Sequence, residues 1–196
     1  MKIVFATKNE GKVKEITEML AGMNIELVSL NHFESLPEIV EDGQTYLENA
    51  LKKAKIISEF TGETVLADDS GLQVDFLGGE PGIYSARYAG EGATDDDNNV
   101  KLLGKLKDVP EELRTASFCC ALVLYHQDGR YHAFEGRWQG RIVDERRGTN
   151  GFGYDPIFLS PEQNKTAAEL SPEIKNKISH RGQAFAKLKS HLENEI

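Results

Sequence analysis

The sequence predicts an α/β fold in which helices flank a mixed β-sheet. Short apolar runs alternate with amphipathic helical patterns through the first part of the chain, which is typical of parallel strands joined by helices. A hairpin-type turn at Asp128 and Gly129 then joins two further strand patterns, so antiparallel pairing is expected in the middle of the chain. Because no internal repeat or long linker interrupts this order, residues 1–196 are expected to form a single domain.

The first half of the chain is expected to place two helices between strands. Residues 3–6 form a short apolar run, and Val13, Ile16 and Leu20 then recur at helical spacing, so a helix is expected from about Gly11 onward. The other expected elements of this half are strand 25–28, helix 45–60, strand 64–67 and strand 72–77.

The second half is expected to hold a hairpin with helices before and after it. Residues 78–82 are a glycine-rich loop by composition. In the next helix, Val100, Leu103 and Leu106 are expected to share the core-facing side. The expected elements are helix 98–107, strand 117–125, strand 131–138 and helix 183–192.

Composition limits the class of protein. The chain is 39% hydrophobic and 28% charged, as in ordinary globular proteins, and its formal charge is −9. This charge argues against a nucleic-acid polymer as partner, because such binding needs a basic face, but it does not exclude a small phosphate ligand. Cys119 and Cys120 are adjacent and are expected to be reduced core residues. Because the longest apolar run is short and no signal peptide is recognised, we expect a cytoplasmic protein without a membrane anchor.

The segment TKNEGK, residues 7–12, lies where the first strand passes into the first helix. The first N–H groups of a helix carry partial positive charge, and Lys8 and Lys12 add full charges. Such a turn is a candidate anion site, with phosphate as the usual anion. An ordinary turn with solvated lysines is the alternative. The segment is not a Walker A loop, because Ala6 and Val13 stand where that motif needs glycine and Ser or Thr.

The segment ADDSG, residues 67–71, places two carboxylates where a strand is expected to end. Ligands of open α/β sheets bind beyond the carboxyl ends of strands, and carboxylates are ligands that suit Mg²⁺. Unless the strand ends there, only one of Asp68 and Asp69 can face a given site, because neighbouring strand residues point to opposite faces. Simple turn chemistry is the alternative for this segment.

Other candidate residues are weaker when taken singly. Glu41 precedes the second helix, on which Asn49 and Lys53 share one face at i,i+4. The late segment GFGYDP, residues 151–156, offers aromatic faces and backbone that can approach a ligand closely. Cations and donors follow at Lys175, His180 and Arg181. A cap, a solvated lysine and a glycine-rich loop are the corresponding structural alternatives.

Taken together, these segments resemble the inosine-triphosphate pyrophosphatase family, enzymes that remove non-standard purine nucleoside triphosphates. The resemblance covers essentially the whole chain and rests on five ordered motifs: TKNEGK at 7–12, LADDSGL at 66–72, GGEPGIYSARYAG at 78–90, GFGYDPIF at 151–158 and SHRGQA at 179–184. It implies an elongated fold of two lobes around a central, twisted mixed sheet, with a cleft, in a protein that is usually a homodimer.

The resemblance also implies roles for individual residues. Asp69 matches the general base, and Glu41 and Asp69 match carboxylates that hold Mg²⁺. Lys8 stands at a position that varies in the family, so its role is open. The residues that match substrate-binding segments are Thr7, Lys8, Asn9, Glu10, Gly11, Lys12, Lys53, Ser70, Phe152, Gly153, Tyr154, Asp155, Lys175, His180 and Arg181.

The implied activity is Mg²⁺-dependent hydrolysis of ITP, dITP and XTP to the nucleoside monophosphate and pyrophosphate. This reaction would cleanse the nucleotide pool and keep these bases out of DNA and RNA. Asp69 would take the proton of the attacking water, and Lys12 and Lys53 would stabilise the leaving pyrophosphate. A donor such as Arg181, Lys175 or a backbone N–H would read the 6-oxo group of the base.

Three other functions are weighed against this activity. A regulatory nucleotide-binding module would keep the loop and the aromatic segment but would not need Asp69 together with Glu41. An RNA-binding protein is disfavoured by the acidic charge and by the lack of a basic, aromatic stripe. Within the enzymes, a pyrophosphatase for modified pyrimidine nucleotides is the alternative.

Overall fold

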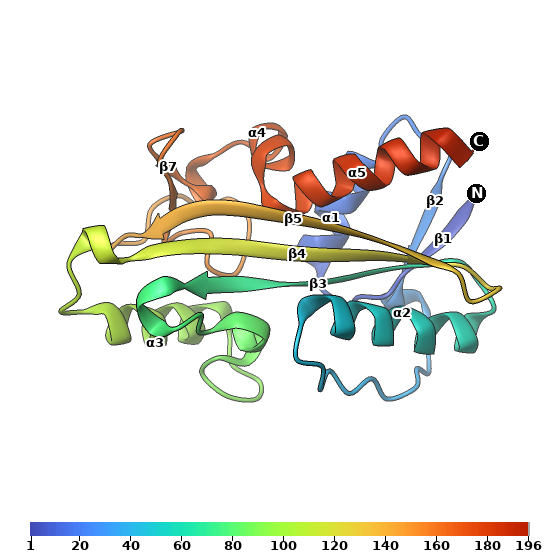
Figure 1. The fold of residues 1–196 in the computed structure, drawn as a ribbon, viewed down its shortest axis with the longest axis horizontal. Helices are drawn as coiled ribbons and strands as arrows, with labels where there is room; N and C mark the ends of the chain where they lie inside the picture. The colour runs from blue at the N-terminus through green and yellow to red at the C-terminus, as the bar shows by residue number, and fades with distance from the viewer. Residues whose placement is uncertain (196) are drawn as a thin grey trace. The chain divides into compact units, whose positions relative to one another are not determined.

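The computed structural model describes residues 1–195 and contains one seven-stranded mixed sheet flanked by helices (Figure 1). The strand order is β2-β1-β3-β4-β5-β6-β7, which confirms the α/β prediction. The strands are β1 (Lys2–Phe5), β2 (Glu26–Ser29), β3 (Val65–Val74), β4 (Thr115–Tyr125), β5 (Tyr131–Ile142), β6 (Phe158–Ser160) and β7 (Lys165–Thr166). The α-helices are α1 (Glu10–Met19), α2 (Tyr46–Thr61), α3 (Asp95–Leu106), α4 (Pro172–Ile178) and α5 (His180–Glu195).

The chain divides into two compact units. Unit 1 contains residues 1–69, residues 120–136 and the chain from Arg181 onward. Unit 2 contains residues 70–119 and 137–180. Strands β3, β4 and β5 each contribute residues to both units. None of the helices within residues 1–195 has both the length and the apolar character needed to cross a membrane.

Unit 1 has three layers, because alternate residues of its strands face opposite helices. On one face, Val4 of β1 and Ala67 of β3 pack with Ala54 of α2. On the other face, Phe5 of β1 packs in a second cluster with residues of α1 and α5. The ribbon shows α2 on one side of the sheet and α1 and α5 on the other (Figure 1).

The parallel part of the sheet lies in unit 1, as the alternating strand and helix patterns predict. β1 pairs in parallel with both β2 and β3, with Val4 opposite Val28 on one side and opposite Val65 on the other. The carboxyl end of β1 therefore lies beside the first residues of β3, and the residues that follow Phe5 come near the residues that follow Leu66. This register positions the candidate site.

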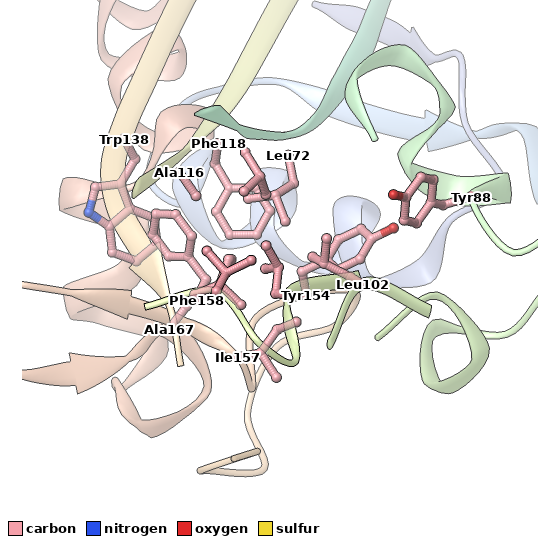
Figure 2. Packing of buried hydrophobic residues seen from close by; sticks show 14 of the residues in the cluster. Leu72, Tyr88, Leu102, Ala116, Phe118, Trp138, Tyr154, Ile157, Phe158 and Ala167 are labelled. Atoms are coloured by element: carbon pink, nitrogen blue, oxygen red, sulfur yellow. The ribbon is translucent and has the colours of Figure 1, made fainter. Parts of the chain in front are cut away.

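Unit 2 is built on a single apolar cluster (Figure 2). Leu72 of β3, Leu102 of α3 and Phe118 of β4 are part of it, together with Trp138 of β5 and Phe158 of β6. The rings of Phe118 and Phe158 lie 4.5 Å apart, and that of Trp138 lies 5.0 Å from Phe158. Strands β6 and β7 add antiparallel pairs at this end of the sheet.

One prediction about the strands is wrong in a way that bears on the site. The sequence predicts two strands separated by a turn at Asp68–Gly71, but β3 runs without a break from Val65 to Val74. β1 ends opposite Leu66, but β3 also has β4 as a hydrogen-bonded neighbour, so sheet pairing overrides the turn preference of Asp, Ser and Gly. The end of the expected second strand, residues 75–77, is a 3-10 helix.

Smaller differences concern turns and helix faces. The hairpin between β4 and β5 is longer than a two-residue turn: the N–H of His126 donates to Arg130 and that of Gly129 donates to His126. Val100 is exposed, and Leu102 instead joins Leu106 on the buried side of α3. Helix α4 is absent from the predicted elements, although Ser171 caps its first turn and Pro172 begins it.

Candidate functional site

The TKNEGK segment forms a capped helix N-terminus in unit 1. The Oδ1 atom of Asn9 accepts a hydrogen bond from the backbone N–H of Lys12 at 3.0 Å, so Asn9 is the N-cap of α1. The hydroxyl of Thr7 in turn accepts from the backbone N–H of Asn9 at 3.1 Å. Lys8, Asn9 and Glu10 are exposed, and Gly11 and Lys12 are half-buried. These two bonds fix the start of α1 in the position that an anion site requires.

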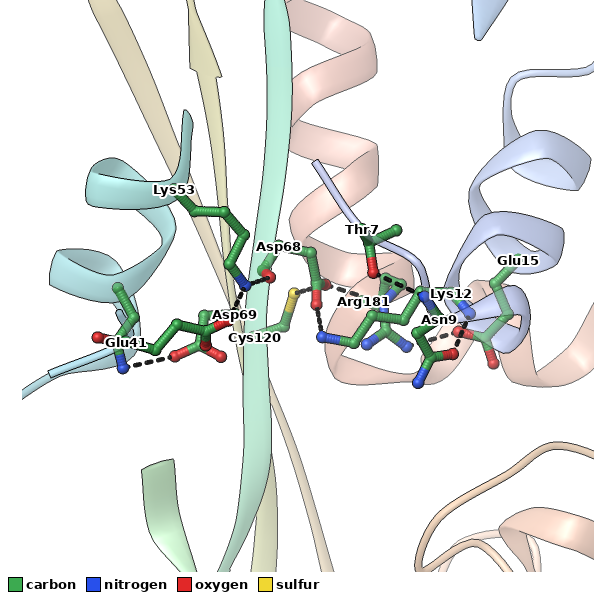
Figure 3. A network of polar contacts seen from close by, with 11 residues as sticks. Thr7, Asn9, Lys12, Glu15, Glu41, Lys53, Asp68, Asp69, Cys120 and Arg181 are labelled. Atoms are coloured by element: carbon green, nitrogen blue, oxygen red, sulfur yellow. Dashed lines mark hydrogen bonds and ion pairs between the residues drawn. The ribbon is translucent and has the colours of Figure 1, made fainter. Parts of the chain in front are cut away.

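The first face of β3 carries Asp68 in a buried network of charges. Lys12 Nζ forms an ion pair with Asp68 Oδ1, and Arg181 Nε donates to Asp68 Oδ2 at 2.9 Å. The guanidinium of Arg181 also pairs with Glu15, whose Oε2 atom lies 2.5 Å from Nη1 of Arg181. Asp68 is 0% exposed and Arg181 is 2% exposed. Two cations and two carboxylates thus compensate one another where water is excluded (Figure 3).

The network sets the ionisation of Asp68 and of its neighbour Cys120. Burial raises the pKa of Asp68, but the charges of Arg181 and Lys12 outweigh burial and hold it well below its ordinary value. The Sγ atom of Cys120 lies 3.2 Å from Asp68 Oδ2. Burial and the Asp68 charge raise the pKa of this thiol well above its ordinary value. Asp68 is therefore a permanent anion, and Cys120 is a neutral thiol.

The opposite face of β3 carries Asp69 with a different set of partners. The side-chain amide of Asn49 donates to Asp69 Oδ2 at 3.1 Å. Asn49 is itself fixed, because its Oδ1 accepts from the backbone N–H of Gly43 at 2.8 Å. Lys53 Nζ lies 3.0 Å from Glu41 Oε1 and donates to the backbone carbonyl of Asp68 at 3.1 Å. Asn49 and Lys53 extend from the same face of α2, as their i,i+4 spacing predicts.

Asp69 differs from Asp68 in its readiness to bind a proton. Burial raises the pKa of Asp69 to about 6, the positive charges of Lys53 and Lys12 oppose the rise, and the charge of Glu41 adds to it. Only 6% of Asp69 is exposed. A carboxylate with a pKa near 6, held by one hydrogen bond, suits a general base at neutral pH.

Glu41 and Asp69 also fit a divalent cation. They are hard oxygen donors, and the repulsion between their charges, which raises the pKa of Asp69, is relieved by a cation. Both residues lie beside Lys53 at one end of the network (Figure 3). The two carboxylates are therefore chemically suited to hold a divalent cation such as Mg²⁺.

In unit 2, the GFGYDP segment is held by a buried ion pair. Lys175 Nζ lies 2.5 Å from Asp155 Oδ2, and both side chains are almost fully buried. The backbone N–H of Phe152 donates to the same Asp155 oxygen at 2.9 Å, and Lys175 Nζ lies 5.1 Å from the centre of the Phe152 ring. Gly151 has a φ of +75°, and a Cβ there would lie 2.0 Å from the Asp155 carboxylate. This fold of the loop presents a half-buried Phe152 ring above a lysine.

Two other residues support the same loop and were not predicted. Asp95 accepts the backbone N–H of Gly153 at 2.7 Å, and Asn99 donates to the carbonyl of Gly153 at 2.8 Å. Asp95 and Asn99 lie one helical turn apart on α3, far from the loop in sequence. The local sequence of α3 does not indicate a contact with this loop; its one signal is that the polar residues Asp95 and Asn99 are spaced i,i+4 and so share a helix face.

Some predicted contacts need correction. We expected Tyr154 to offer a flat face to a base, but its ring is 4% exposed, packs in the unit 2 cluster and donates its hydroxyl to Ser85. The residue before it, Gly153, has a positive φ of +62°. His180 is buried and stacks on Phe118 with ring centres 4.8 Å apart, and Ser70 is a half-buried residue of β3.

The predicted residues therefore form two groups, each within one unit. Unit 1 brings together the residues of the loop at 7–12 with Glu41, Lys53, Asp69 and Arg181. Unit 2 holds Ser70, the segment 152–155, Lys175 and His180. The buried partners of Arg181, which are Asp68 and Glu15, were not predicted from the sequence. The local pattern shows only that Lys12 and Glu15 lie near each other on α1, because they are spaced i,i+3.

Comparison with known proteins identifies the family. The family model described as the Ham1 family matches residues 3–191. The chain belongs to the Ham1 family. A relative from Geobacter sulfurreducens named dITP/XTP pyrophosphatase is 52% identical over 97% of this chain and 96% of its own length. A second from Vibrio cholerae, with the same name, is 48% identical over 99% of this chain and 98% of its own length.

Solved structures of Ham1 proteins have the same fold. A HAM1 protein from Coxiella burnetii superposes with a TM-score of 0.89 at 43% identity and covers 99% of both chains. The Ham1 protein of Staphylococcus aureus superposes with a TM-score of 0.88 at 41% identity and covers 100% of both chains. These likenesses extend over the whole chain, as the five ordered motifs predict.

Proposed function

We propose that this Ham1 protein hydrolyses non-standard purine nucleoside triphosphates, ITP, dITP and XTP, to the nucleoside monophosphate and pyrophosphate. The observation that carries the proposal is the setting of Asp69, a buried carboxylate with a pKa of about 6 beside Glu41 and Lys53. The choice of substrate is supported by the name of two relatives, dITP/XTP pyrophosphatase, which are 52% and 48% identical to this chain over nearly their full length.

The residues of unit 1 account for the hydrolytic step. Glu41 and Asp69 are the ligands we assign to Mg²⁺, which when bound neutralises phosphate charge and lowers the pKa of a nearby water. Because Asn49 donates to Asp69 Oδ2, we assign Oδ1 as the atom that takes the proton of the attacking water. The water oxygen would then bond to the α-phosphorus as the bond from this phosphorus to the oxygen bridging the α and β phosphates breaks, and the leaving pyrophosphate keeps the electron pair of the broken bond.

The cations of unit 1 are assigned to the triphosphate. Lys12 and the backbone N–H groups at the start of α1 add positive charge where the loop at 7–12 is fixed by Thr7 and Asn9. Lys53 is placed beside the carboxylates to stabilise negative charge on the leaving group. Arg181 is assigned an indirect part: by pairing with Asp68, it stabilises the carboxylate that pairs with Lys12.

The base is assigned to groups of unit 2. Phe152 offers a half-buried ring on which a purine can stack, and Lys175 lies below that ring. Lys175 and the backbone N–H groups of the loop are the donors we assign to the 6-oxo oxygen that separates hypoxanthine and xanthine from adenine. We also propose that the protein acts in the cytoplasm as a homodimer and protects DNA and RNA from these bases.

A pyrophosphate-release panel tests this function. The untagged protein is assayed with ITP, dITP, XTP, GTP, ATP and pyrimidine triphosphates, with Mg²⁺ and after removal of metal. We expect Mg²⁺-dependent release from ITP, dITP and XTP with much slower release from GTP and ATP. The matched variants are Asp69→Asn and Asp42→Asn, because Asp42 is an exposed carboxylate that pairs with Lys52 on the surface.

The outcomes of the panel separate the alternatives. Tight binding of ITP with no release in the wild type would indicate a regulatory module, and preference for pyrimidine triphosphates would place the chain among the pyrimidine pyrophosphatases. Equal loss of activity in the Asp69 and Asp42 variants would remove the role assigned to Asp69.

A further inference from the structure

Three histidines of unit 1 lie together at the hairpin that joins β4 and β5. His126 follows the last residue of β4, His132 is the second residue of β5, and His191 lies in the last turns of α5. One ring nitrogen of each lies within 4.8 Å of the other two, and all three side chains are half-buried. The ring centres of His132 and His191 are 4.0 Å apart, and those of His126 and His132 are 5.8 Å apart.

The fold explains why these residues meet. Cys120, Leu122 and Leu124 alternate along β4 on the face covered by α5, and His126 continues that alternation. On β5, His132 precedes Phe134 by two residues, and Phe134 packs against the same cluster. On α5, His191 lies one turn beyond Leu188, which is buried in the cluster. The three imidazoles thus stand where aliphatic side chains would otherwise complete the outer end of the core.

The arrangement has the chemistry of a transition-metal site. Imidazole nitrogen is a ligand for Zn²⁺, Cu²⁺, Ni²⁺ and Co²⁺, whereas Mg²⁺ prefers oxygen. Nitrogens around a tetrahedral Zn²⁺ lie about 3.4 Å apart, given bonds of about 2.0–2.1 Å. The three nitrogens here need to approach by about 1.4 Å at most, which rotation of half-buried side chains provides.

His126 contributes a buried ring nitrogen to the cluster. The Nε2 atom of His126 is buried, and it has no hydrogen-bond partner among residues 1–195. A buried polar nitrogen without a partner costs free energy, and coordination to a metal ion removes that cost. Three protein ligands also leave a coordination position for water or another small ligand.

We propose that His126, His132 and His191 form a binding site for one divalent transition-metal ion, of which Zn²⁺ and Co²⁺ are the probes of choice. The site is separate from Glu41 and Asp69, whose oxygen donors suit Mg²⁺. Metal bound there joins the β4–β5 hairpin to the last turns of α5, so it stabilises the folded state of unit 1.

The test uses the full chain without a histidine tag, stripped of metal and held in excess Mg²⁺ so that the carboxylates are occupied. Co²⁺ is titrated while its visible absorption is followed, and Zn²⁺ is titrated by calorimetry. We expect one ion per chain and a rise in Tm with Zn²⁺. Each of His126→Gln, His132→Gln and His191→Gln should weaken binding by more than about tenfold, since even the loss of an outer partner of a ligand costs ~10–100-fold.

His32→Gln is the matched control, because His32 is an exposed histidine of unit 1 that contacts Ser29 rather than the cluster. It should bind metal like the wild type. NMR of the wild type provides a readout that needs no variant: of the five histidines, metal should shift the ring signals of three and leave those of His32 and His180 unchanged. Absence of saturable binding, equal affinity in all variants, or shifts in other histidines would overturn the proposal.

Discussion

Asp68 and Asp69 are consecutive residues of one unbroken strand, and their carboxylates lie on opposite faces of it. Asp68 meets Arg181 and Lys12 on one face, while Asp69 meets Asn49 on the other. The pKa of Asp68 lies well below its ordinary value, and that of Asp69 is raised to about 6. Two identical side chains thus differ in pKa, because the strand directs them into different surroundings.

The first prediction concerns catalysis. Asp69→Asn should lower kcat by ~10²–10⁴-fold, because an amide of nearly the same shape cannot take a proton or hold a cation by charge. The measurement is kcat for ITP with saturating Mg²⁺, with folding checked by circular dichroism. A folded variant that kept most of its kcat would show that another group is the base.

The second prediction concerns stability of the metal-free protein. The folded-state pKa of Asp69 is about 6, against an ordinary value of 3.8, so the folded chain binds more protons than the unfolded chain between these values. The contribution of Asp69 to the free energy of unfolding therefore falls as pH rises through this window. The full cost is at most about 3 kcal/mol above pH 6.

Denaturant unfolding in a chelator measures this effect. Asp69→Asn should be more stable than the wild type at pH 8, and the difference should shrink at pH 4. An Asp69 variant equally destabilised at both pH values would contradict the raised pKa.

The third prediction concerns the loop at 7–12. Lys12→Ala should raise KM for ITP and lower kcat, because it removes charge beside the capped start of α1. Lys8→Ala is the control, since Lys8 is an exposed lysine of the same loop. Kinetics at physiological ionic strength check both variants. If the two variants gave the same small change, the loop would be an ordinary turn with solvated lysines.

The fourth prediction concerns Arg181. Arg181→Met should destabilise the protein by about 3–5 kcal/mol, because the substitution removes the buried cation that pairs with both Asp68 and Glu15. Denaturant unfolding measures the loss. The double variant Arg181→Met with Glu15→Gln should lose less stability than the sum of the single changes. Additive losses would mean that the two residues act independently.

The fifth prediction concerns the base. Phe152→Ala should lower kcat/KM for ITP and GTP by similar factors, since stacking contributes ~1–3 kcal/mol per base and tolerates any base. The ratio of the two values should therefore be preserved. Phe76→Ala is a useful control, because Phe76 is an exposed ring of unit 2 without an assigned role. Selective loss of ITP turnover in the Phe152 variant would assign base selection to the ring itself.

Local patterns in the sequence were sufficient for much of this picture. Apolar spacing predicts α1 and α2 closely, and the i,i+4 pair of Asn49 and Lys53 correctly predicts that both lie on one face of α2. These features depend on residues that are near one another in the chain, so periodicity reveals them.

Other features depend on partners that local patterns do not reveal. Asp68 and Arg181 are 113 residues apart, and nothing around Arg181 indicates a buried carboxylate as its partner. The turn preference of Asp68, Ser70 and Gly71 likewise gives way to pairing of β3 with β4, a strand distant in sequence. The resemblance assigns the base to Asp69, but the different partners and pKa values of Asp68 and Asp69 are seen only in the structure.

The ion pair between Lys12 and Asp68 bears on which anions the loop can retain. Because Lys12 already pairs with Asp68, an incoming phosphate must compete with the Asp68 carboxylate for the lysine. A ligand that makes one contact gains little binding free energy when it replaces the Lys12–Asp68 ion pair. A triphosphate makes several contacts at once, and these can compensate for the lost ion pair. The loop should thus release inorganic phosphate and a nucleoside monophosphate easily, which limits inhibition by product and keeps the site available while ordinary anions are abundant.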